Sequence, residues 1–189
     1  MRSVVFNKGI KENAGIFNHT QGWGIMAEAM LGNGERAYEY CKAALPAAYN
    51  NKAEIRQMEP YVQGQTTYSI FSPRAGNTRV SWLSGAATWA YYSLTQYILG
   101  IRPQYEGLLI DPCVPSNWKK FTVVRRFRNK EITINFENPS GVQKGIVSLS
   151  LNGEKLSGTL LPVDKLMDKN TVTAVMGKVS ASEQTVQRI

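Results

Sequence analysis

The single histidine, His19, and the adjacent pair Ser84 and Gly85 are residue types that could take part in chemistry. An imidazole can donate a hydrogen bond or carry a positive charge near neutral pH. Ser84 and Gly85 come directly before a predicted helix, whose first amides lack acceptors and whose dipole favours an anion, while glycine permits close approach to the backbone. Two simpler interpretations stay open: an ordinary hydrogen-bonded histidine and an ordinary helix cap.

The two cysteines, Cys41 and Cys113, do not form a metal motif. They lack CxxC spacing and have no histidine beside them, which argues against zinc. Two cysteines are also too few for a disulfide framework. We expect buried, chemically idle thiols, no metal site and no cofactor.

The formal charge of +8 invites a nucleic-acid hypothesis, but the charge is evenly spread. The residues up to Pro103 include ten basic and six acidic residues. The rest of the chain includes twelve basic and eight acidic residues. The one basic cluster holds Arg125, Arg126, Arg128 and Lys130. On one strand Arg126, Arg128 and Lys130 would share a face, which is typical of a solvated strand. We therefore expect no nucleic-acid partner.

Length and composition indicate a globular protein of one ordinary or two small domains. The chain has 189 residues, of which 43% are hydrophobic and 19% charged. No stretch reaches the roughly 18 uninterrupted apolar residues of a membrane span, and the opening residues lack the apolar core of a signal peptide. These patterns predict a cytoplasmic protein with no membrane contact.

The helical part of the sequence precedes Pro103. Apolar residues at spacings of three and four predict helices over 21–31 and 35–44, joined by a short glycine-containing loop. A third helix is predicted from Ser84, as its cap, to about Leu99. Residues 46–82 form a long connection that we expect to be ordered. Three helices leave broad apolar faces uncovered, so this part looks truncated.

After Pro103 the apolar period falls to two, which predicts strands separated by turns such as Asn152-Gly153. The expected strands are 107–110, 121–127, 131–138, 145–151, 157–161 and 171–176. Their hairpin-like spacing predicts a small antiparallel β-sandwich. The fold class is accordingly α plus β, in more than one domain.

Several motifs resemble the C-terminal region of glycoside hydrolase family 94, the cellobiose, cellodextrin and chitobiose phosphorylases. The motifs are GIKENAGIFNHT at 9–20, EPYVQGQ at 59–65, SWLSG at 81–85, ILGIRP at 98–103 and LIDPCVP at 109–115. They occur in the family's order across residues 5–128. The resemblance implies the last helices of an (α/α)6 catalytic barrel over residues 1–105 and a C-terminal β-sandwich over residues 106–189.

The resemblance also implies the chemistry, which is reversible phosphorolysis of a β-glucoside such as cellobiose or a cellodextrin, with inversion, to α-glucose 1-phosphate. Phosphate is itself the nucleophile, so the second carboxylate of an inverting glycosidase is replaced by groups that hold the anion. By resemblance, His19, Ser84 and Gly85 bind phosphate, Gln65 contacts the glucosyl residue and Lys11 reaches the acceptor-side sugar.

The resemblance assigns no catalytic acid to this chain, because the family's Asp-Gly-Asp-Trp-Asn-Asp motif is absent. Glu12, Asn13 and Glu59 are instead expected to brace loops through hydrogen bonds. Trp82, Tyr61 and Tyr68 could stack on a sugar face or pack in the core. The chain alone is therefore predicted to be inactive, and its partners are a β-linked glucose disaccharide or oligosaccharide, phosphate and the missing N-terminal part of the enzyme. Homodimer formation is a further expectation.

Two alternatives to the phosphorylase hypothesis stay open. The chain could be a non-catalytic structural or carbohydrate-binding module left by a truncated or split gene. It could also be the phosphorylase-like end of a cyclic β-1,2-glucan synthase, although the HTQGW run at 19–23 looks closer to cellobiose and cellodextrin phosphorylases.

Overall fold

The structure is a computed structural model that describes residues 5–179 of the chain. Helices and strands occupy largely separate stretches, so the protein belongs to the α plus β class that the hydrophobic patterns predict. The described residues form two compact units. The first contains the residues up to Ala27 and Glu39–Leu94, and the second contains Glu28–Tyr38 and the residues from Thr95 onward. Within 5–179 no helix combines the length and apolarity that a membrane crossing requires.

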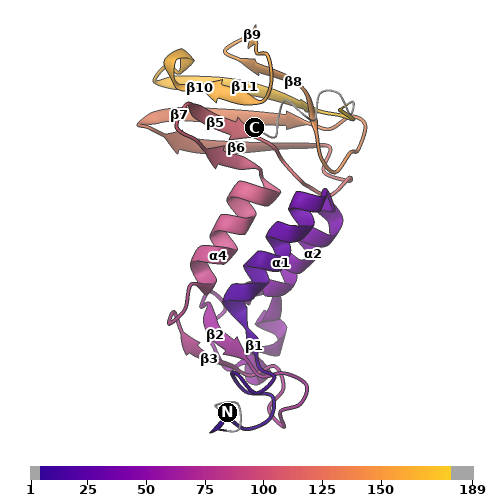
Figure 1. The fold of residues 1–189 in the computed structure, drawn as a ribbon, viewed down its shortest axis with the longest axis vertical. Coiled ribbons are helices and arrows are strands. Elements are labelled where there is room, and N and C mark those ends of the chain that lie inside the picture. Colours follow the sequence, from indigo (N-terminus) through magenta and orange to yellow (C-terminus); the bar gives the residue numbers. More distant parts are fainter. Residues whose placement is uncertain (1–4, 180–189) are drawn as a thin grey trace. The chain divides into compact units, whose positions relative to one another are not determined.

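The first two helices form the predicted short-looped pair (Figure 1). Helix α1 (Asn18–Leu31) begins three residues before its predicted start, and α2 (Gly34–Ala44) follows after a two-residue loop. Gly32 ends α1 with a φ of +86°, a left-handed conformation that glycine adopts without a Cβ penalty.

The long connection predicted to be ordered contains regular structure. Its elements are η2 (Pro46–Lys52), α3 (Ala53–Arg56), β2 (Gly64–Thr67) and β3 (Thr78–Ser81). Together with β1 (Ile16–Phe17), the two strands form an antiparallel sheet in the order β1-β2-β3. This small sheet belongs wholly to the first unit.

The third predicted helix is present in two parts, α4 (Ala86–Tyr92) and the π-helical segment η3 (Ser93–Ile98). The prediction that Ser84 caps it is wrong. Gly85 occupies the N-cap position, with φ −68° and ψ 17°, and the cap makes no side-chain hydrogen bond. Because Gly85 stands between Ser84 and the first helical residue, the Ser84 hydroxyl lies one position too early to cap α4.

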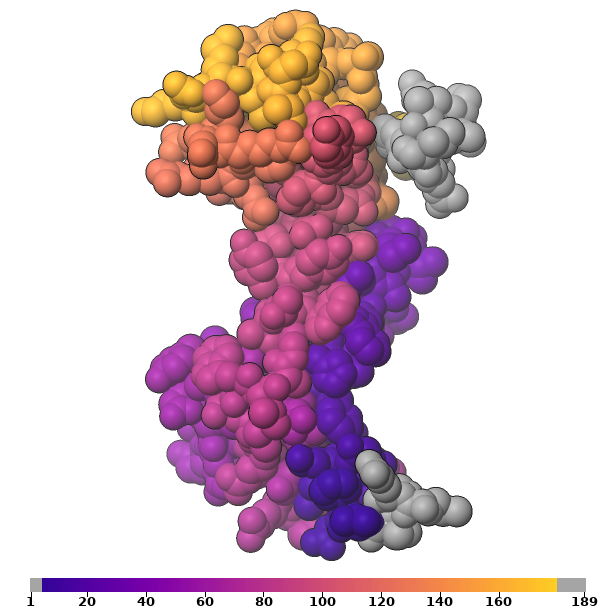
Figure 2. All heavy atoms as spheres, turned by 60° about the vertical axis from the view of Figure 1, so that its left-hand side comes forward, coloured from indigo at the N-terminus to yellow at the C-terminus, as the bar shows by residue number. Residues whose placement is uncertain are grey.

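The second unit contains two sheets (Figure 1), built from the predicted strand region and from one further strand at 101–103; Figure 2 shows the atoms of this stretch in rose to yellow. The three-stranded sheet has the order β10-β5-β4, from β4 (Ile101–Pro103), β5 (Gly107–Ile110) and β10 (Leu160–Pro162). The five-stranded sheet has the order β6-β7-β11-β8-β9, from β6 (Lys120–Phe127), β7 (Lys130–Glu137), β8 (Ile146–Leu151), β9 (Glu154–Lys155) and β11 (Lys169–Met176). One turn of 3-10 helix, η4 (Val163–Lys165), follows β10.

One strand pair corrects the prediction of a purely antiparallel arrangement. Strand β11 runs parallel to β7, with Thr171 opposite Thr133, and antiparallel to β8 on its other side. The period-two pattern could not reveal this, because side chains alternate between faces in both kinds of pairing.

The core of the five-stranded sheet follows from that alternation. On β7, Ile132, Ile134 and Phe136 are buried, and Val172 and Ala174 are buried on β11. Phe136 stacks on Phe121 of β6, with ring centroids 4.4 Å apart. Both cysteines are free and buried, which confirms the expectation of buried thiols.

The basic cluster does not lie along one strand as expected. Arg128 and Asn129 form a two-residue turn between β6 and β7, with φ values of +48° and +63°. Positive φ at both central positions is the geometry of a tight hairpin turn, for which asparagine is well suited. The chain therefore reverses between Arg126 and Lys130, which lie opposite Glu131 and Phe127 on paired strands.

Candidate functional site

One edge of the β1-β2-β3 sheet collects three of the predicted site residues. Because the sheet is antiparallel, the ends of β1 and β3 and the start of β2 lie at the same edge (Figure 1). His19 follows β1 by two residues, Gln65 is the second residue of β2, and Ser84 follows β3 by three residues. Residues distant in sequence thus meet where α1 and α4 begin.

The strand register fixes this arrangement in detail. Phe17 lies opposite Thr66, and Gly64 lies opposite Ser81. The Asn18 side-chain amide donates a hydrogen bond of 2.9 Å to the Gly64 carbonyl, which ties the start of α1 to β2. This positioning role of Asn18 was not predicted, because its partner lies 46 residues away in the sequence.

Each of these three residues has a buried polar atom with no hydrogen-bond partner within residues 5–179, as does Thr66, the next residue of β2. In the three predicted site residues the atoms are His19 Nδ1, Gln65 Oε1 and Ser84 Oγ. A buried polar atom without a partner costs free energy, of the order of 1–3 kcal/mol. Three such atoms at one sheet edge indicate a place for a polar ligand or for polar groups from another part of the protein.

A series of ring contacts joins His19 to Gly85. The His19 ring lies edge-on to Trp23 with centroids 5.5 Å apart, and Trp23 lies edge-on to Trp89 at 5.8 Å. A Cβ placed on Gly85 would lie 3.2 Å from Trp89 Cδ1 and 3.4 Å from its Nε1. These contacts bring the start of α1 beside the start of α4.

Lys11 lies outside the sheet, in a turn before β1. It precedes β1 by five residues, so it is on the side of the first β1 residue, away from His19. Its Nζ lies 5.7 Å from the centroid of the Phe6 ring, a cation–π contact. The sheet therefore brings together four of the five predicted site residues, counting Gly85, and leaves Lys11 apart.

The loop-bracing role expected of three polar residues is present in part. The Asn13 side chain donates a 2.8 Å hydrogen bond to the Phe6 carbonyl. Glu59 contributes its backbone carbonyl, which accepts a 2.8 Å bond from Arg56, rather than its carboxylate. Glu12 is exposed.

The residue that holds the loop around Glu59 is Arg56, whose guanidinium also donates to the carbonyls of Met58 and Val62. Burial lowers the pKa of Arg56, and the charge of Glu59 opposes that shift.

Two of the three aromatic residues considered for sugar stacking are exposed. Trp82 is 55% exposed and Tyr61 is 71% exposed, so neither packs in the core of the first unit. Val80 and Trp82 have φ values of +58° and +59°, a conformation that non-glycine residues adopt only under constraint. This strained segment leads directly into Ser84.

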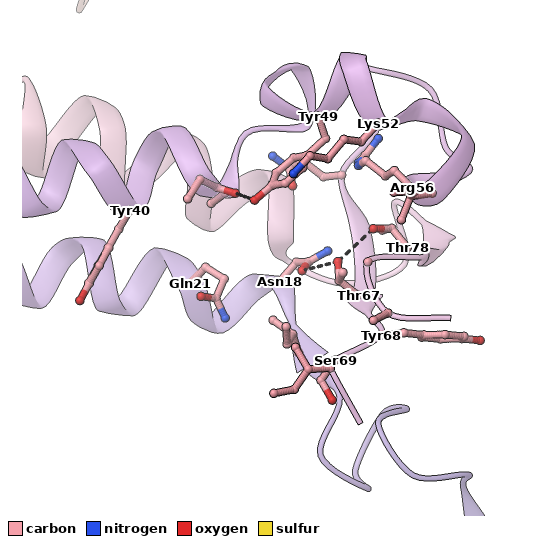
Figure 3. A pocket seen from close by; sticks show the side chains of 18 residues that line it. Asn18, Gln21, Tyr40, Tyr49, Lys52, Arg56, Thr67, Tyr68, Ser69 and Thr78 are labelled. Carbon is pink, nitrogen blue, oxygen red and sulfur yellow. Dashed lines mark hydrogen bonds between the residues drawn. The ribbon is translucent and has the colours of Figure 1, made fainter. Parts of the chain in front are cut away.

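A cavity of about 570 Å³ also lies in the first unit (Figure 3). Asn18, Thr67 and Thr78 form a polar line along its wall: Thr67 Oγ1 lies 3.2 Å from Asn18 Oδ1 and 3.0 Å from Thr78 Oγ1. None of the five predicted site residues lines this cavity. The cavity reaches this sheet edge through Asn18, the neighbour of His19, and through Gln63, which precedes β2.

Comparison with known proteins agrees with the motifs that the site contains. The model of the glycosyl hydrolase 94 superfamily, catalytic domain, matches residues 2–100. An N,N'-diacetylchitobiose phosphorylase of Vibrio proteolyticus is 39% identical over 170 residues, and one of Vibrio furnissii is 37% identical. A solabiose phosphorylase of Paenibacillus borealis is 30% identical over 162 residues.

These matches cover most of this chain but little of the relatives. They include 86% to 90% of the present sequence and 21% of each of the three phosphorylases, so the chain spans about a fifth of their length. The matched segment contains the whole β1-β2-β3 sheet and α4. On this evidence the chain belongs to the glycosyl hydrolase 94 superfamily.

Proposed function

We propose that this chain supplies the phosphate-binding part of the active site of an inverting glycoside phosphorylase. His19, Ser84 and Gly85 hold inorganic phosphate, which attacks the anomeric carbon of a β-glycoside. A carboxylic acid outside this chain protonates the leaving oxygen from the opposite face of the sugar. The donors around phosphate stabilise its charge without a competing carboxylate.

The observation that carries this proposal is the gathering of unpartnered polar atoms at one sheet edge. His19 Nδ1 and Ser84 Oγ are buried and lack partners among the described residues. Both can donate to an oxyanion once the histidine is protonated on Nδ1. A bound phosphate would supply the acceptors that the protein itself does not.

The sugar side of the proposal involves Gln65 and Lys11. Gln65 Oε1, also buried without a partner in the described residues, can accept a hydrogen bond from a hydroxyl of the glucosyl residue. Lys11 contacts the acceptor-side sugar in this proposal, although it lies away from the sheet edge that holds His19, Gln65 and Ser84. We further propose that residues 1–105 form barrel helices and residues 106–189 a C-terminal sandwich; the first four and last ten of these lie outside the described residues.

Two substrate classes follow from different observations. The motifs favour cellobiose or a cellodextrin, whereas the names of the two Vibrio relatives favour N,N'-diacetylchitobiose. In either case inorganic phosphate is a substrate, no cofactor is needed, and the remaining partner is the part of the enzyme that carries the acid.

Phosphate binding tests the proposal on the chain itself. Because His19 is the sole histidine, its imidazole protons give one identifiable pair of NMR resonances. Titration with inorganic phosphate, at ionic strength held constant with chloride, should shift this pair along a saturable curve. Ser84→Ala should weaken binding about tenfold, the effect of one hydrogen bond to an anion. Resonances that do not respond to phosphate would contradict the proposed site.

Activity provides a second test. The chain alone should release no phosphate from α-glucose 1-phosphate with glucose as acceptor, because it has no catalytic acid. A chimera in which this chain replaces the matching fifth of the V. proteolyticus phosphorylase should release phosphate, and His19→Ala should abolish that release. Comparing α-glucose 1-phosphate with α-N-acetylglucosamine 1-phosphate as donors separates the two substrate classes. Turnover by the unaided chain would refute the assignment of the acid to another part of the enzyme.

A further inference from the structure

Trp89 places an indole edge directly over the residue that precedes α4. It lies four positions after Gly85, and long helical side chains point back toward the preceding turn. A Cβ at residue 85 would meet Cδ1 and Nε1 of this ring at 3.2 Å and 3.4 Å. The polar edge of the indole is therefore the part of the ring that faces Gly85.

Within residues 5–179 the Trp89 side chain makes ring contacts with Trp23 and Tyr92, and its indole N–H donates no hydrogen bond to another residue. The side chain is half-buried. An indole N–H can only donate, and tryptophan N–H groups usually find a partner when they are buried. Water or an oxygen of a bound ligand can therefore accept from this N–H.

The packing around Trp89 holds this donor in place. Its ring lies edge-on to Trp23 and to Tyr92, with centroids 5.8 Å and 5.7 Å away. A Cβ on Gly22 of α1 would lie only 2.8 Å from Trp89 Cβ, so the two helices are in close contact at this point. A side chain fixed in this way loses little further freedom when it binds a ligand.

We propose that the Trp89 indole N–H donates a hydrogen bond to the phosphate ion held by His19 and Ser84. This inference rests on the proposed function and adds a binding residue to that site. Phosphate fits better than a neutral hydroxyl, because the neighbouring unpartnered atoms, His19 Nδ1 and Ser84 Oγ, can donate to the same ion. An ion with four oxygens accepts several such bonds at once.

The experiment observes the donor directly. The chain has four tryptophans, so a nitrogen-15 spectrum contains four indole N–H resonances. The Trp89 resonance is assigned as the one absent from Trp89→Phe, and in the unmodified chain by its proximity to the Gly85 amide. Inorganic phosphate is then added at constant ionic strength, with glucose as the parallel neutral ligand.

Phosphate should move the Trp89 indole resonance and the His19 imidazole resonances with one common dissociation constant, while glucose alone should not move the indole. Trp89→Phe keeps an aromatic ring but removes the donor, and should weaken phosphate binding about tenfold. Trp118→Phe is the matched control. Trp118 packs against Tyr38 and Phe121 in the second unit, so its loss should leave phosphate binding unchanged.

The outcomes separate this inference from the proposed function. If phosphate moves the His19 resonances but not the Trp89 indole, and Trp89→Phe binds phosphate as well as the unmodified chain, the inference is wrong and the proposed function stands. An indole that responds to glucose but not to phosphate also overturns the inference. If neither residue responds to phosphate, both proposals fail. Should Trp89→Phe not fold, the titration of the unmodified chain decides alone.

Discussion

Gly22 of α1 faces Trp89 of α4 so closely that residue 22 has no room for a side chain. A Cβ there would lie 2.8 Å from Trp89 Cβ and 2.9 Å from its carbonyl oxygen. Two residues along the same helix, a Cβ on Gly24 would meet nothing within 4 Å. One glycine is thus required by packing, and its neighbour is not.

The two glycines predict opposite effects of the same substitution. Gly22→Ala should lower the free energy of unfolding by about 1–3 kcal/mol, because the helices must move apart. Gly24→Ala should raise it by up to about 1 kcal/mol, because alanine favours helix over glycine and meets no neighbour here. Urea denaturation of both variants measures the difference. Equal effects would show that α1 and α4 do not pack as described.

Ser84→Ala should not destabilise the chain, although Ser84 is at the proposed phosphate site. Its hydroxyl oxygen is buried without a partner in the described residues, so removing it relieves a cost rather than breaking a bond. Thermal unfolding without phosphate should show an unchanged or slightly higher midpoint.

The buried Ser93 provides the contrast for Ser84. Its hydroxyl donates a 3.1 Å hydrogen bond to the Ala90 carbonyl. Ser93→Ala should therefore cost about 0.5–1.5 kcal/mol, the net value of an ordinary hydrogen bond. A larger loss for Ser84→Ala than for Ser93→Ala would mean that the Ser84 hydroxyl has a structural partner.

Cys113 predicts a loss of stability in alkaline solution. Burial raises the pKa of its thiol from 9.0 to about 11; Lys144 opposes this shift, and Asp111 and Glu35 add to it. Between these two values the unfolded chain has lost the thiol proton while the folded chain keeps it. The unfolded state then binds fewer protons, so stability falls as pH rises, by about 2–3 kcal/mol in total.

The comparison variant for this effect is Cys113→Ala. Urea unfolding between pH 8 and pH 11 should show a shallower fall in stability for the variant than for the unmodified chain, whatever its stability at pH 8. Parallel pH profiles would contradict the assignment to Cys113.

Asp111 joins two cations in the second unit. Its Oδ2 accepts hydrogen bonds from Arg102 and, at 3.0 Å, from Lys144. Its side chain is only 26% exposed, so Asp111→Asn leaves two positive charges partly shielded from water and should cost about 1–3 kcal/mol. Asp168, whose side chain is 96% exposed and 2.9 Å from Lys130, is the control. Asp168→Asn should leave the urea midpoint unchanged; a similar loss in both variants would argue against a special role for Asp111.

The sequence predicted the elements of this protein better than their connections. Apolar spacing located α1, α2 and α4 because each buries one face, and the alternating pattern located the strands of the second unit for the same reason. The pattern could not predict that β11 runs parallel to β7, because apolar and polar residues alternate in the same way in parallel and antiparallel strands. The predicted N-cap of α4, Ser84, was one residue too early. The helix start depends on local backbone angles that the residue types do not determine.

The site was recovered through motifs rather than through physical patterning. His19, Gln65 and Ser84 come together only because the register of β1, β2 and β3 sets them at one edge, and a register between segments nearly 50 residues apart is not visible in a single sequence. Trp89 was not among the predicted site residues. Its relation to Gly85 depends on the side-chain direction, which became clear only with the helix in place.

The position of β11 between β7 and β8 also limits when the second sheet can close during synthesis. A ribosome that has made β6 through β9 has produced two separate hairpins, and the edges of β7 and β8 that β11 will pair are still open. The hairpins can join only after residues 169–176 have emerged and entered the gap. Until that moment the nascent chain presents strand edges that chaperones or other chains can bind.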